Sequence, residues 1–264
     1  MDNYVAFIPV RGGSKSIPLK NIREINGRPL VYWTLDAAVQ CAKIDRVYLC
    51  TDSGAIRAKV EEYIRRNDCA EKLRCIDRPP ETATDTASTE SAMLYFAQAC
   101  PDFAHMILIQ ATSPLLQAKH LSEAIAAYEA KQYDSLLSVV RQKRFCWKQD
   151  TAGFVPVNYD FRARPRRQEF DGYLVENGAF YINTRENLLR DECRLSGAIG
   201  VYEMDEETYF EIDEPSDWLI IEALMRKNGV SVWVLSALYC QHMIPFKPNF
   251  LRYSTLQARE SSSS

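Results

Sequence analysis

Residues 4–21 read YVAFIPVRGGSKSIPLKN, and this stretch decides the fold. The apolar run Tyr4–Val10 predicts a buried strand. It is followed by Arg11-Gly12-Gly13-Ser14, which predicts a glycine loop directly at the carboxyl end of that strand. A strand that leads into such a loop is the first unit of a pattern that continues through half of the chain.

Strand and helix patterns alternate after this first unit. The predicted strands are 46–50, 73–76, 106–109 and 135–140, and the predicted helices are 29–42, 55–66, 86–100 and 121–131. Each crossover is long enough to return the chain parallel to the preceding strand, so we expect an α/β fold with a doubly wound, mostly parallel sheet. Ligands of such sheets bind outside the carboxyl ends of the strands, which directs attention to loops 11–21, 51–54, 77–90 and 110–114.

The pattern loosens after residue 140. Residues 141–170 are rich in Arg, Lys and aromatic side chains, and strands are again expected at 177–183, 198–202 and 209–212. A helix is predicted at 217–227, and Asn228-Gly229 would terminate it. The apolar run Val230–Cys240 is too short for a membrane span, so we divide the chain into a domain at 1–229 and a tail of unknown role at 230–264.

Composition excludes several classes of protein. The 264 residues carry a net charge of −3, so no global field attracts nucleic acid or an anionic membrane. Eight scattered cysteines form no CxxC pair, which argues against a zinc site and favours reduced thiols. The first residues, Met1-Asp2-Asn3-Tyr4, do not resemble a secretory signal, so we expect a cytoplasmic protein, or a nuclear one in a eukaryote.

The loop 11–21 suits a polyphosphate. Adjacent glycines let backbone N–H groups point at an anion, and Arg11, Lys15 and Lys20 add three cations. The loop matches neither the Walker A nor the GxGxxG pattern. The alternative is a basic, solvated loop with glycine in a turn.

A second candidate is the acidic pair Glu211 and Asp213. On a strand, their spacing puts both carboxylates on one face with Ile212 on the other. Two close carboxylates near phosphates are what Mg²⁺ needs. The alternative is an acidic turn before the next helix, with Asp217 as its cap.

The third candidate is the arginine-rich segment Arg162-Ala163-Arg164-Pro165-Arg166-Arg167-Gln168. The acidic overall charge and the lack of a long basic face argue against nucleic-acid binding. A small anionic substrate suits the guanidinium fork better. A charged surface loop is the remaining alternative.

Together these residues resemble the CMP-sialic acid synthetases (N-acylneuraminate cytidylyltransferases) over about residues 4–229. The matching motifs, in the family's order, are Arg11–Asn21, Thr51-Asp52, Arg78, Asp85-Thr86-Ala87-Ser88, Gln110-Ala111-Thr112-Ser113-Pro114, Arg164-Pro165-Arg166-Arg167-Gln168, Glu176-Asn177-Gly178-Ala179-Phe180-Tyr181 and Glu211-Ile212-Asp213. The forms of the fifth and sixth motifs are most similar to the animal-type branch, or to a synthetase for the deaminated sugar KDN.

The resemblance implies a nucleotide-diphospho-sugar transferase-like fold and Mg²⁺ dependence. The implied reaction transfers CMP from CTP to the anomeric hydroxyl of a nine-carbon 2-keto acid sugar. It also implies a protruding dimerisation arm within residues 141–180, and a homodimer or homotetramer.

The resemblance also implies roles for individual residues. Those implied to be catalytic are Arg11, Lys20 and Asp213, and the implied metal ligands are Glu211 and Asp213. The implied nucleotide-binding residues are Arg11, Gly12, Gly13, Ser14, Lys20, Asn21, Arg78, Ser88, Ala111, Thr112 and Ser113. The implied residues for the sugar are Gln110, Arg166, Arg167, Gln168, Glu176 and Asn177.

Two positions depart from the family pattern. Glu211 stands where the family usually has Asp, so Asp213 is the stronger metal ligand candidate. Ser16 stands where the family has Gly, and a positive φ there would cost about 1 kcal/mol. Two rival functions stay open: a cytidylyltransferase for another acid sugar such as 3-deoxy-manno-octulosonate, and a nucleotide-binding protein without turnover.

Overall fold

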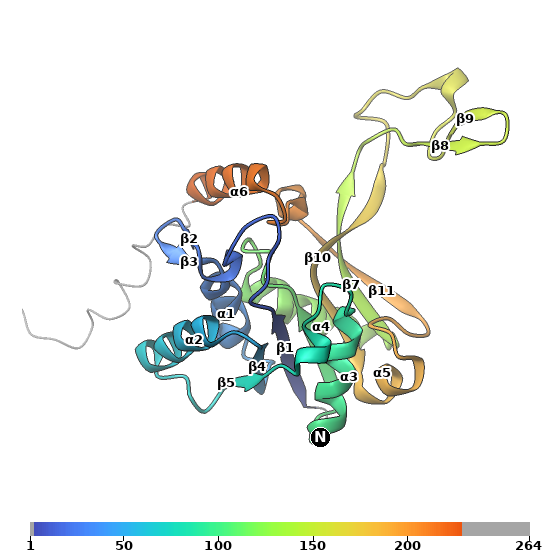
Figure 1. The fold of residues 1–264 in the computed structure, drawn as a ribbon. Coiled ribbons are helices and arrows are strands. Elements are labelled where there is room, and N and C mark those ends of the chain that lie inside the picture. Colours follow the sequence, from blue (N-terminus) through green and yellow to red (C-terminus); the bar gives the residue numbers. More distant parts are fainter. Residues whose placement is uncertain (1–2, 229–264) are drawn as a thin grey trace, which may run out of the picture. The chain divides into compact units, whose positions relative to one another are not determined.

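A seven-stranded sheet forms the centre of the computed structural model, which describes residues 3–228 (Figure 1). The strands lie in the order β11-β7-β10-β6-β1-β4-β5. Their bounds are β1 (Tyr4–Val10), β4 (Arg46–Thr51), β5 (Leu73–Asp77), β6 (His105–Ile109), β7 (Ser135–Gln142), β10 (Tyr173–Thr184) and β11 (Ile199–Met204). All neighbouring pairs are parallel except those of β10, which is antiparallel to β6 and β7. The mostly parallel α/β sheet is confirmed.

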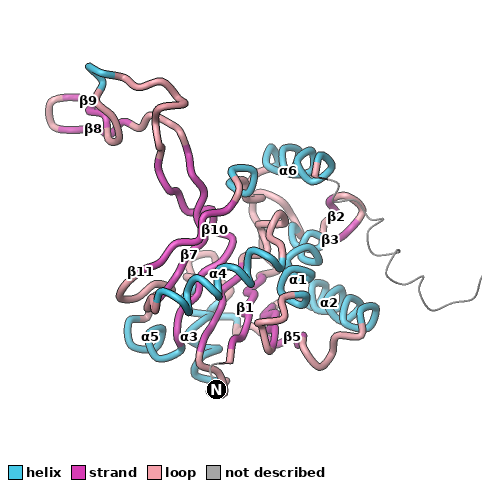
Figure 2. Tube along the Cα trace, turned by 180° about the vertical axis from the view of Figure 1, so that it is seen from behind, coloured by secondary structure: helices cyan, strands magenta, loops and turns pink. Residues whose placement is uncertain are grey.

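Helices cover both faces of this sheet (Figures 1 and 2). One face packs against α1 (Leu30–Gln40), α2 (Gly54–Asn67) and α4 (Ala118–Lys131). The other packs against α3 (Thr89–Ala99) and α5 (Arg185–Asp191). The central strand β1 is therefore apolar at consecutive positions, because Ala6 and Ile8 enter one core while Val5 and Phe7 enter the other.

The last described helix, α6 (Pro215–Lys227), packs on a third apolar cluster. Its buried Trp218 and Ile221 join Ile17 of the glycine-rich loop and Trp33 of α1. This cluster attaches α6 to the loop 11–21, and so places the residues just before α6 beside that loop. A short hairpin of β2 (Glu24–Ile25) and β3 (Arg28–Pro29) precedes α1.

An arm leaves the sheet between β7 and β10 (Figure 1). It holds a hairpin of β8 (Trp147–Asp150) and β9 (Gly153–Pro156), followed by a single 3-10 turn, η3 (Phe161–Ala163). Its aromatic residues contact one another, as in the ring pairs Phe145–Tyr159 and Trp147–Phe161, yet Phe154 is 70% exposed. The arm expected within 141–180 is thus present, and its role in dimerisation stays a prediction.

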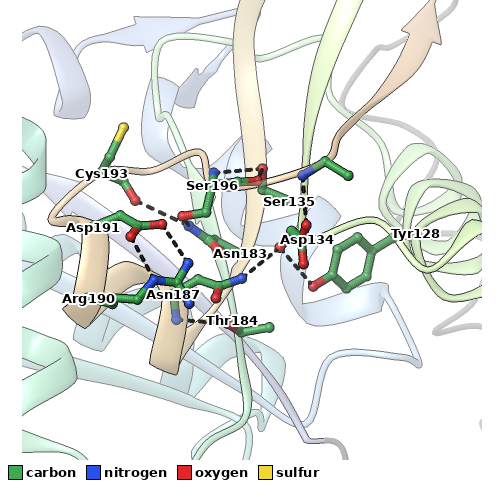
Figure 3. A network of polar contacts seen from close by, with 11 residues as sticks. Tyr128, Asp134, Ser135, Asn183, Thr184, Asn187, Arg190, Asp191, Cys193 and Ser196 are labelled. Carbon is green, nitrogen blue, oxygen red and sulfur yellow. Dashed lines mark hydrogen bonds and ion pairs between the residues drawn. The ribbon is translucent and has the colours of Figure 1, made fainter.

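At the amino ends of β7 and β11, polar groups lock the sheet edge (Figure 3). The Ser135 hydroxyl donates to the Ser196 carbonyl at 2.7 Å and accepts from the Ser196 N–H at 2.9 Å. The Asn183 amide donates to the Cys193 carbonyl at 3.2 Å. Because these contacts lie at the edge opposite the carboxyl ends of the parallel strands, they support the fold and not the candidate site.

Two sequence predictions are wrong, and some elements were not predicted at all. Residues 209–212 form no strand, because β11 ends at Met204 and a 3-10 turn, η4 (Glu206–Tyr209), follows it. Helix α3 begins at Thr89 and not at residue 86, since the Ser88 hydroxyl provides its N-cap. Helix α5 was missed because it has only seven residues, too few for a periodic signal.

Other predictions fall partly or wholly outside the described residues. The predicted tail 230–264, which includes the apolar run Val230–Cys240, lies outside the described residues. Within residues 3–228 the seven cysteines are unbridged, and Cys41, Cys50 and Cys69 are buried. None of the helices in that range has the length and hydropathy that crossing a lipid bilayer requires.

Candidate functional site

A cavity of about 320 Å³ opens at the carboxyl ends of β1 and β6. It brings together three of the four loops that the sequence singled out, and it adds Asp213 from the segment before α6. The residues that line it are Pro9, Val10, Arg11, Gly13, Ser14, Lys20, Asn21, Arg78, Asp85, Ala87, Thr89, Gln110, Ala111, Thr112 and Asp213. Ten of these are predicted site residues, so most of the nucleotide group converges as expected.

The decisive contact joins the two ends of the domain. The Lys20 ammonium donates to the Asp213 carboxylate at 3.0 Å and to the Ile212 carbonyl at 2.6 Å. The Lys20 side chain is 12% exposed, so the ion pair is partly shielded from water. The basic loop and the acidic segment, 193 residues apart in sequence, therefore form one site.

The glycine loop is held by the neighbouring strand. The Gly12 N–H donates to the Asp52 carboxylate at 2.8 Å, and a Cβ at Gly12 would lie 2.8 Å from the Ser53 Cβ. Gly12 thus permits a close backbone approach, and its N–H is already engaged. Its neighbours Arg11, Gly13 and Ser14 line the cavity, whereas Gly12 does not.

Ser16 is not strained. The described non-glycine residues with positive φ include Leu19 but not Ser16, so the cost that a positive φ would impose there does not arise. The Ser16 hydroxyl donates to the Glu214 carboxylate at 3.0 Å. The departure from the family pattern therefore adds a link between the loop and the N-cap of α6.

Asp85 lines the cavity beside the basic loop 11–21. Its carboxylate pairs with Arg11 at 3.2 Å and with Lys15 at 2.9 Å. The hydrogen bond from Lys15 and the charge of Arg11 lower the pKa of Asp85. The sequence identifies Asp85 only as part of a matching motif, whereas the structure places its carboxylate against the cations.

The acidic pair flanks the buried Ile212 even though no strand is present. The Ile212 N–H donates to the Thr112 carbonyl at 2.9 Å, which holds the segment against the loop after β6. Burial, reinforced by the nearby Asp213 charge, raises the pKa of Glu211 to about 7. The Asp217 carboxylate accepts from the Asp213 and Glu214 N–H groups at 3.0 and 2.7 Å. Asp217 therefore belongs to the cap of α6 and also orients the acidic segment.

These oxygens fit a divalent cation. A half-buried carboxylate whose pKa is raised by burial and by its acidic neighbour would be stabilised by a positive ion between them. Residues 3–228 contain no cluster of three or more His, Cys, Asp or Glu side chains able to hold a metal. The two carboxylates would therefore need phosphate oxygens or water to complete a coordination shell, which is the usual arrangement for Mg²⁺.

A bulge in β10 makes room for Glu211. The register of β10 against β7 shifts between Glu176 and Tyr181, and Gly178 within this bulge has φ +63°. A Cβ on Gly178 would lie 2.5 Å from both Glu211 carboxylate oxygens. Next to it, the fully buried Asn177 donates to the Thr208 hydroxyl at 3.1 Å, so Asn177 holds η4 and does not line the cavity.

Of the three predicted nucleotide residues Arg78, Ser88 and Ser113, Arg78 and Ser113 are buried, whereas Ser88 is exposed. Arg78 is 8% exposed and donates to the Thr82 carbonyl and hydroxyl, while its N–H donates to the Thr51 carbonyl at 3.0 Å. Ser113 is buried behind Thr112, and the Ser88 hydroxyl accepts from the Ser91 N–H at 3.1 Å. Ser88 and Ser113 do not line the cavity, although their neighbours do.

The sugar group converges least. Gln110 lines the cavity, but Arg166, Arg167 and Gln168 are exposed in the segment between η3 and β10. Arg167 approaches Glu206 at 3.8 Å. Glu176 accepts from the Tyr181 hydroxyl at 2.8 Å, outside the cavity. Their roles toward a substrate stay predictions.

Sequence reasoning missed two supporting residues. Asp52 was part of a matching motif but was given no role, and it holds the Gly12 N–H. Glu214 was regarded only as part of an acidic turn, and it receives the Ser16 hydrogen bond. Both act across loops, so a pattern within one segment could not have revealed them.

Comparison with known proteins identifies the family. The family model described as cytidylyltransferase matches residues 5–244. The chain belongs to the cytidylyltransferase family. The chain is 38% identical over 231 residues to N-acylneuraminate cytidylyltransferase of Oncorhynchus mykiss, covering 86% of this chain and 51% of the relative. It is 36% identical over 228 residues to N-acylneuraminate cytidylyltransferase A of Danio rerio, with 85% and 51% covered.

A bacterial relative is more distant. N-acylneuraminate cytidylyltransferase of Streptococcus agalactiae is 28% identical over 221 residues, with 81% of this chain and 51% of the relative covered. The chain thus spans about half the length of the curated relatives it matches.

Solved structures match the fold of this cytidylyltransferase. A CMP:2-keto-3-deoxy-manno-octonic acid synthetase complexed with CTP aligns with a TM-score of 0.62 at 17% identity, covering 86% of this chain and 100% of the other. A 4-diphosphocytidyl-2C-methyl-D-erythritol synthase from Anaerococcus prevotii gives 0.63 at 12% identity, with 85% and 96% covered. At these identities the likeness concerns the fold alone.

Proposed function

We propose that this cytidylyltransferase transfers CMP from CTP to the anomeric hydroxyl of a nine-carbon 2-keto acid sugar of the sialic acid type, releasing pyrophosphate. The observation that carries the proposal is the contact between Lys20 and Asp213 inside the cavity, because it joins a polyphosphate loop to an acidic pair. The names of the fish and bacterial relatives support the choice of nucleotide and acceptor.

The chain's cations would hold the triphosphate. Arg11 and Lys20, with the loop backbone at Gly13 and Ser14, line the cavity and would neutralise the phosphate oxygens. The Gly12 N–H is committed to Asp52, so Gly12 would serve the loop's shape and not bind phosphate directly. Fixing the triphosphate in this way would leave the α-phosphate open to in-line attack by the sugar hydroxyl.

The base and ribose would lie beside Arg78 and the loop after β6. Arg78, Gln110, Ala111 and Thr112 line the cavity, and Arg78 keeps its guanidinium buried. A site built to hydrogen-bond one base edge rejects other bases, because mispairing leaves buried polar groups unsatisfied. The buried Ser113 would support this wall next to Thr112, and Ser88 would support it as the N-cap of α3, whose Thr89 lines the cavity.

Glu211 and Asp213 would hold Mg²⁺. When bound there, the ion would lower the pKa of a coordinated hydroxyl and shield phosphate charge. Lys20 would stay close to Asp213 and orient its carboxylate, while Asp217 fixes the backbone of the acidic segment.

The sugar would be positioned by Gln110 from the cavity wall and by the arm. Arg166, Arg167 and Gln168 lie outside the cavity of this chain, so we propose that the arms of two copies pack together in a homodimer or homotetramer. The exposed Phe154 and Trp147 of the arm suit such an interface. Sedimentation at micromolar concentration would show a monomer if this assembly is wrong.

The seven thiols within residues 3–228 are unbridged and partly buried, which suits a reducing compartment and supports a cytoplasmic or nuclear location.

The function is tested by turnover of CTP with a panel of acid sugars, including N-acetylneuraminate, KDN and 3-deoxy-manno-octulosonate, with pyrophosphate as the readout. Lys20→Met and Asp213→Ala should each lower kcat by at least about 100-fold, the usual cost of losing one electrostatic stabiliser. Lys43→Met is the matched control, since Lys43 pairs with Glu129 on the surface away from the cavity. Activity that survives both site substitutions, or CTP binding without pyrophosphate release for every sugar, would overturn the proposal.

A further inference from the structure

Each of the loop's three cations already has a carboxylate partner. Lys20 pairs with Asp213, whereas Arg11 and Lys15 share Asp85. Asp213 belongs to the acidic pair, but Asp85 belongs to neither the metal pair nor the nucleotide group. A carboxylate that is bound to two of the loop's three cations therefore needs its own explanation.

Asp85 contacts the two cations that a phosphate group of the ligand would contact. Its two carboxylate oxygens each contact one cation, Oδ1 with Arg11 at 3.2 Å and Oδ2 with Lys15 at 2.9 Å, and the residue lines the cavity. An anion that binds Arg11 and Lys15 must share them with Asp85 or displace it, because the carboxylate and a phosphate carry like charges.

Few contacts hold the segment that carries Asp85 against the glycine loop. The hydrogen bonds among residues 84–87 are local, such as that from the Ala87 N–H to the Thr84 hydroxyl at 3.1 Å. The printed contacts from this segment to the glycine loop run through the side chains of Arg11 and Lys15, and Arg11 also donates to the Thr84 carbonyl at 3.3 Å. Side-chain exposures of 36%, 75% and 55% for Arg11, Lys15 and Asp85 allow the ion pairs to open without burying a charge.

We propose that Asp85 is an internal competitor for the phosphate groups of the ligand: it holds Arg11 and Lys15 when the loop is empty and is displaced by a polyphosphate. This inference rests on the proposed function in one respect, since it takes the loop to be the phosphate site. The competition weakens the binding of phosphate groups to Arg11 and Lys15, and this favours release of pyrophosphate after the transfer.

The test is the dissociation constant of inorganic pyrophosphate, measured calorimetrically without added metal. Asp85→Asn should tighten pyrophosphate binding by about 3- to 10-fold, the scale expected when two exposed ion pairs no longer compete. Asp77→Asn is the matched control, because Asp77 is an exposed carboxylate at the end of β5 that pairs with Arg57 and does not line the cavity. It removes the same charge and should leave the constant unchanged.

A double-mutant cycle separates direct competition from general repulsion. If Asp85 acts by occupying the cations, the gain from Asp85→Asn should shrink at least about 2-fold in a Lys15→Met background. Equal gains in both backgrounds, no gain at all, or the same gain from Asp77→Asn would overturn the inference. If neither the parent protein nor Asp85→Asn binds pyrophosphate, the inference and the phosphate loop fall together. If the cycle behaves as expected but no sugar accepts CMP, the inference stands and the proposed function fails.

Discussion

Gly178 is the position where one added methyl group should disturb the fold and the acidic pair together. Its φ of +63° lies in the left-handed region, where an alanine costs about 1–2 kcal/mol more than glycine. The new Cβ would also lie 2.5 Å from both carboxylate oxygens of Glu211. Because those oxygens end a flexible side chain, Glu211 would rotate away and the backbone would keep its path.

The expected stability loss of Gly178→Ala is thus about 1–2 kcal/mol, which corresponds to a fall in Tm of about 2–8 °C for a domain of this size. Moving Glu211 should also raise the Mg²⁺ concentration for half-maximal activity about 10-fold, the lower end of the effect of disturbing a metal site's supporting groups. Thermal unfolding and a Mg²⁺ titration of pyrophosphate release measure the two effects.

Gly54→Ala is the matched control for this substitution. Gly54 opens α2 and does not have a positive φ, and a Cβ added to it would meet no atom within 4 Å. The substitution should be neutral or stabilising by up to about 1 kcal/mol. If Gly178→Ala left both Tm and the Mg²⁺ requirement at parent values, the argument that the bulge exists to admit Glu211 would be refuted.

Two further predictions concern contacts around the cavity and on the far face of the sheet. Ser16→Ala removes the hydrogen bond to Glu214, so KM for CTP should rise about 3-fold while kcat changes little, and equal kinetics in steady-state assays would contradict this link. The hydrogen bond from Arg194 lowers the pKa of Glu90, so its stabilisation is complete above the ordinary Glu range and is lost as pH falls through the lowered pKa. Urea unfolding of Glu90→Gln should therefore show a deficit of about 1 kcal/mol at pH 7 that shrinks below pH ~4, and a deficit independent of pH would exclude the ion pair as its cause.

The core of the fold was predictable because its signals are local. Strand β1 is buried on both faces and followed by glycines, so Tyr4–Val10 was correct to the residue. The arm hairpin was missed, since its strand β8 is exposed throughout and lacks the alternation that marks a half-buried strand. Residues 209–212 mimic a strand because Ile212 is buried between two acids, yet the Thr112 carbonyl and not a ladder accepts its N–H.

The residues of the candidate site were predictable, but the hydrogen bonds and ion pairs between them were not. The cations and the acidic pair were named from chemistry. The convergence of the basic loop with the loop after β6 followed from the sheet's carboxyl edge, whereas the acidic segment reaches the cavity without a strand of its own. The partner of Asp85 and the partner of the Gly12 N–H depend on how loops from different strands cross. Such contacts join residues about 40 to 75 positions apart, beyond the reach of any local pattern.

The pairing of Lys20 with Asp213 has a consequence for the order of assembly. The ribosome synthesises the basic loop 193 residues before Asp213, so a nascent chain can form its central strands well before the candidate site is complete. The site would be completed late in folding, when α6 packs against Ile17 and Trp33 and brings Asp213 to the Lys20 ammonium. Proteolytic removal of α6 together with the segment before it would leave the basic loop, which could still bind an anion, without the carboxylates of Glu211 and Asp213.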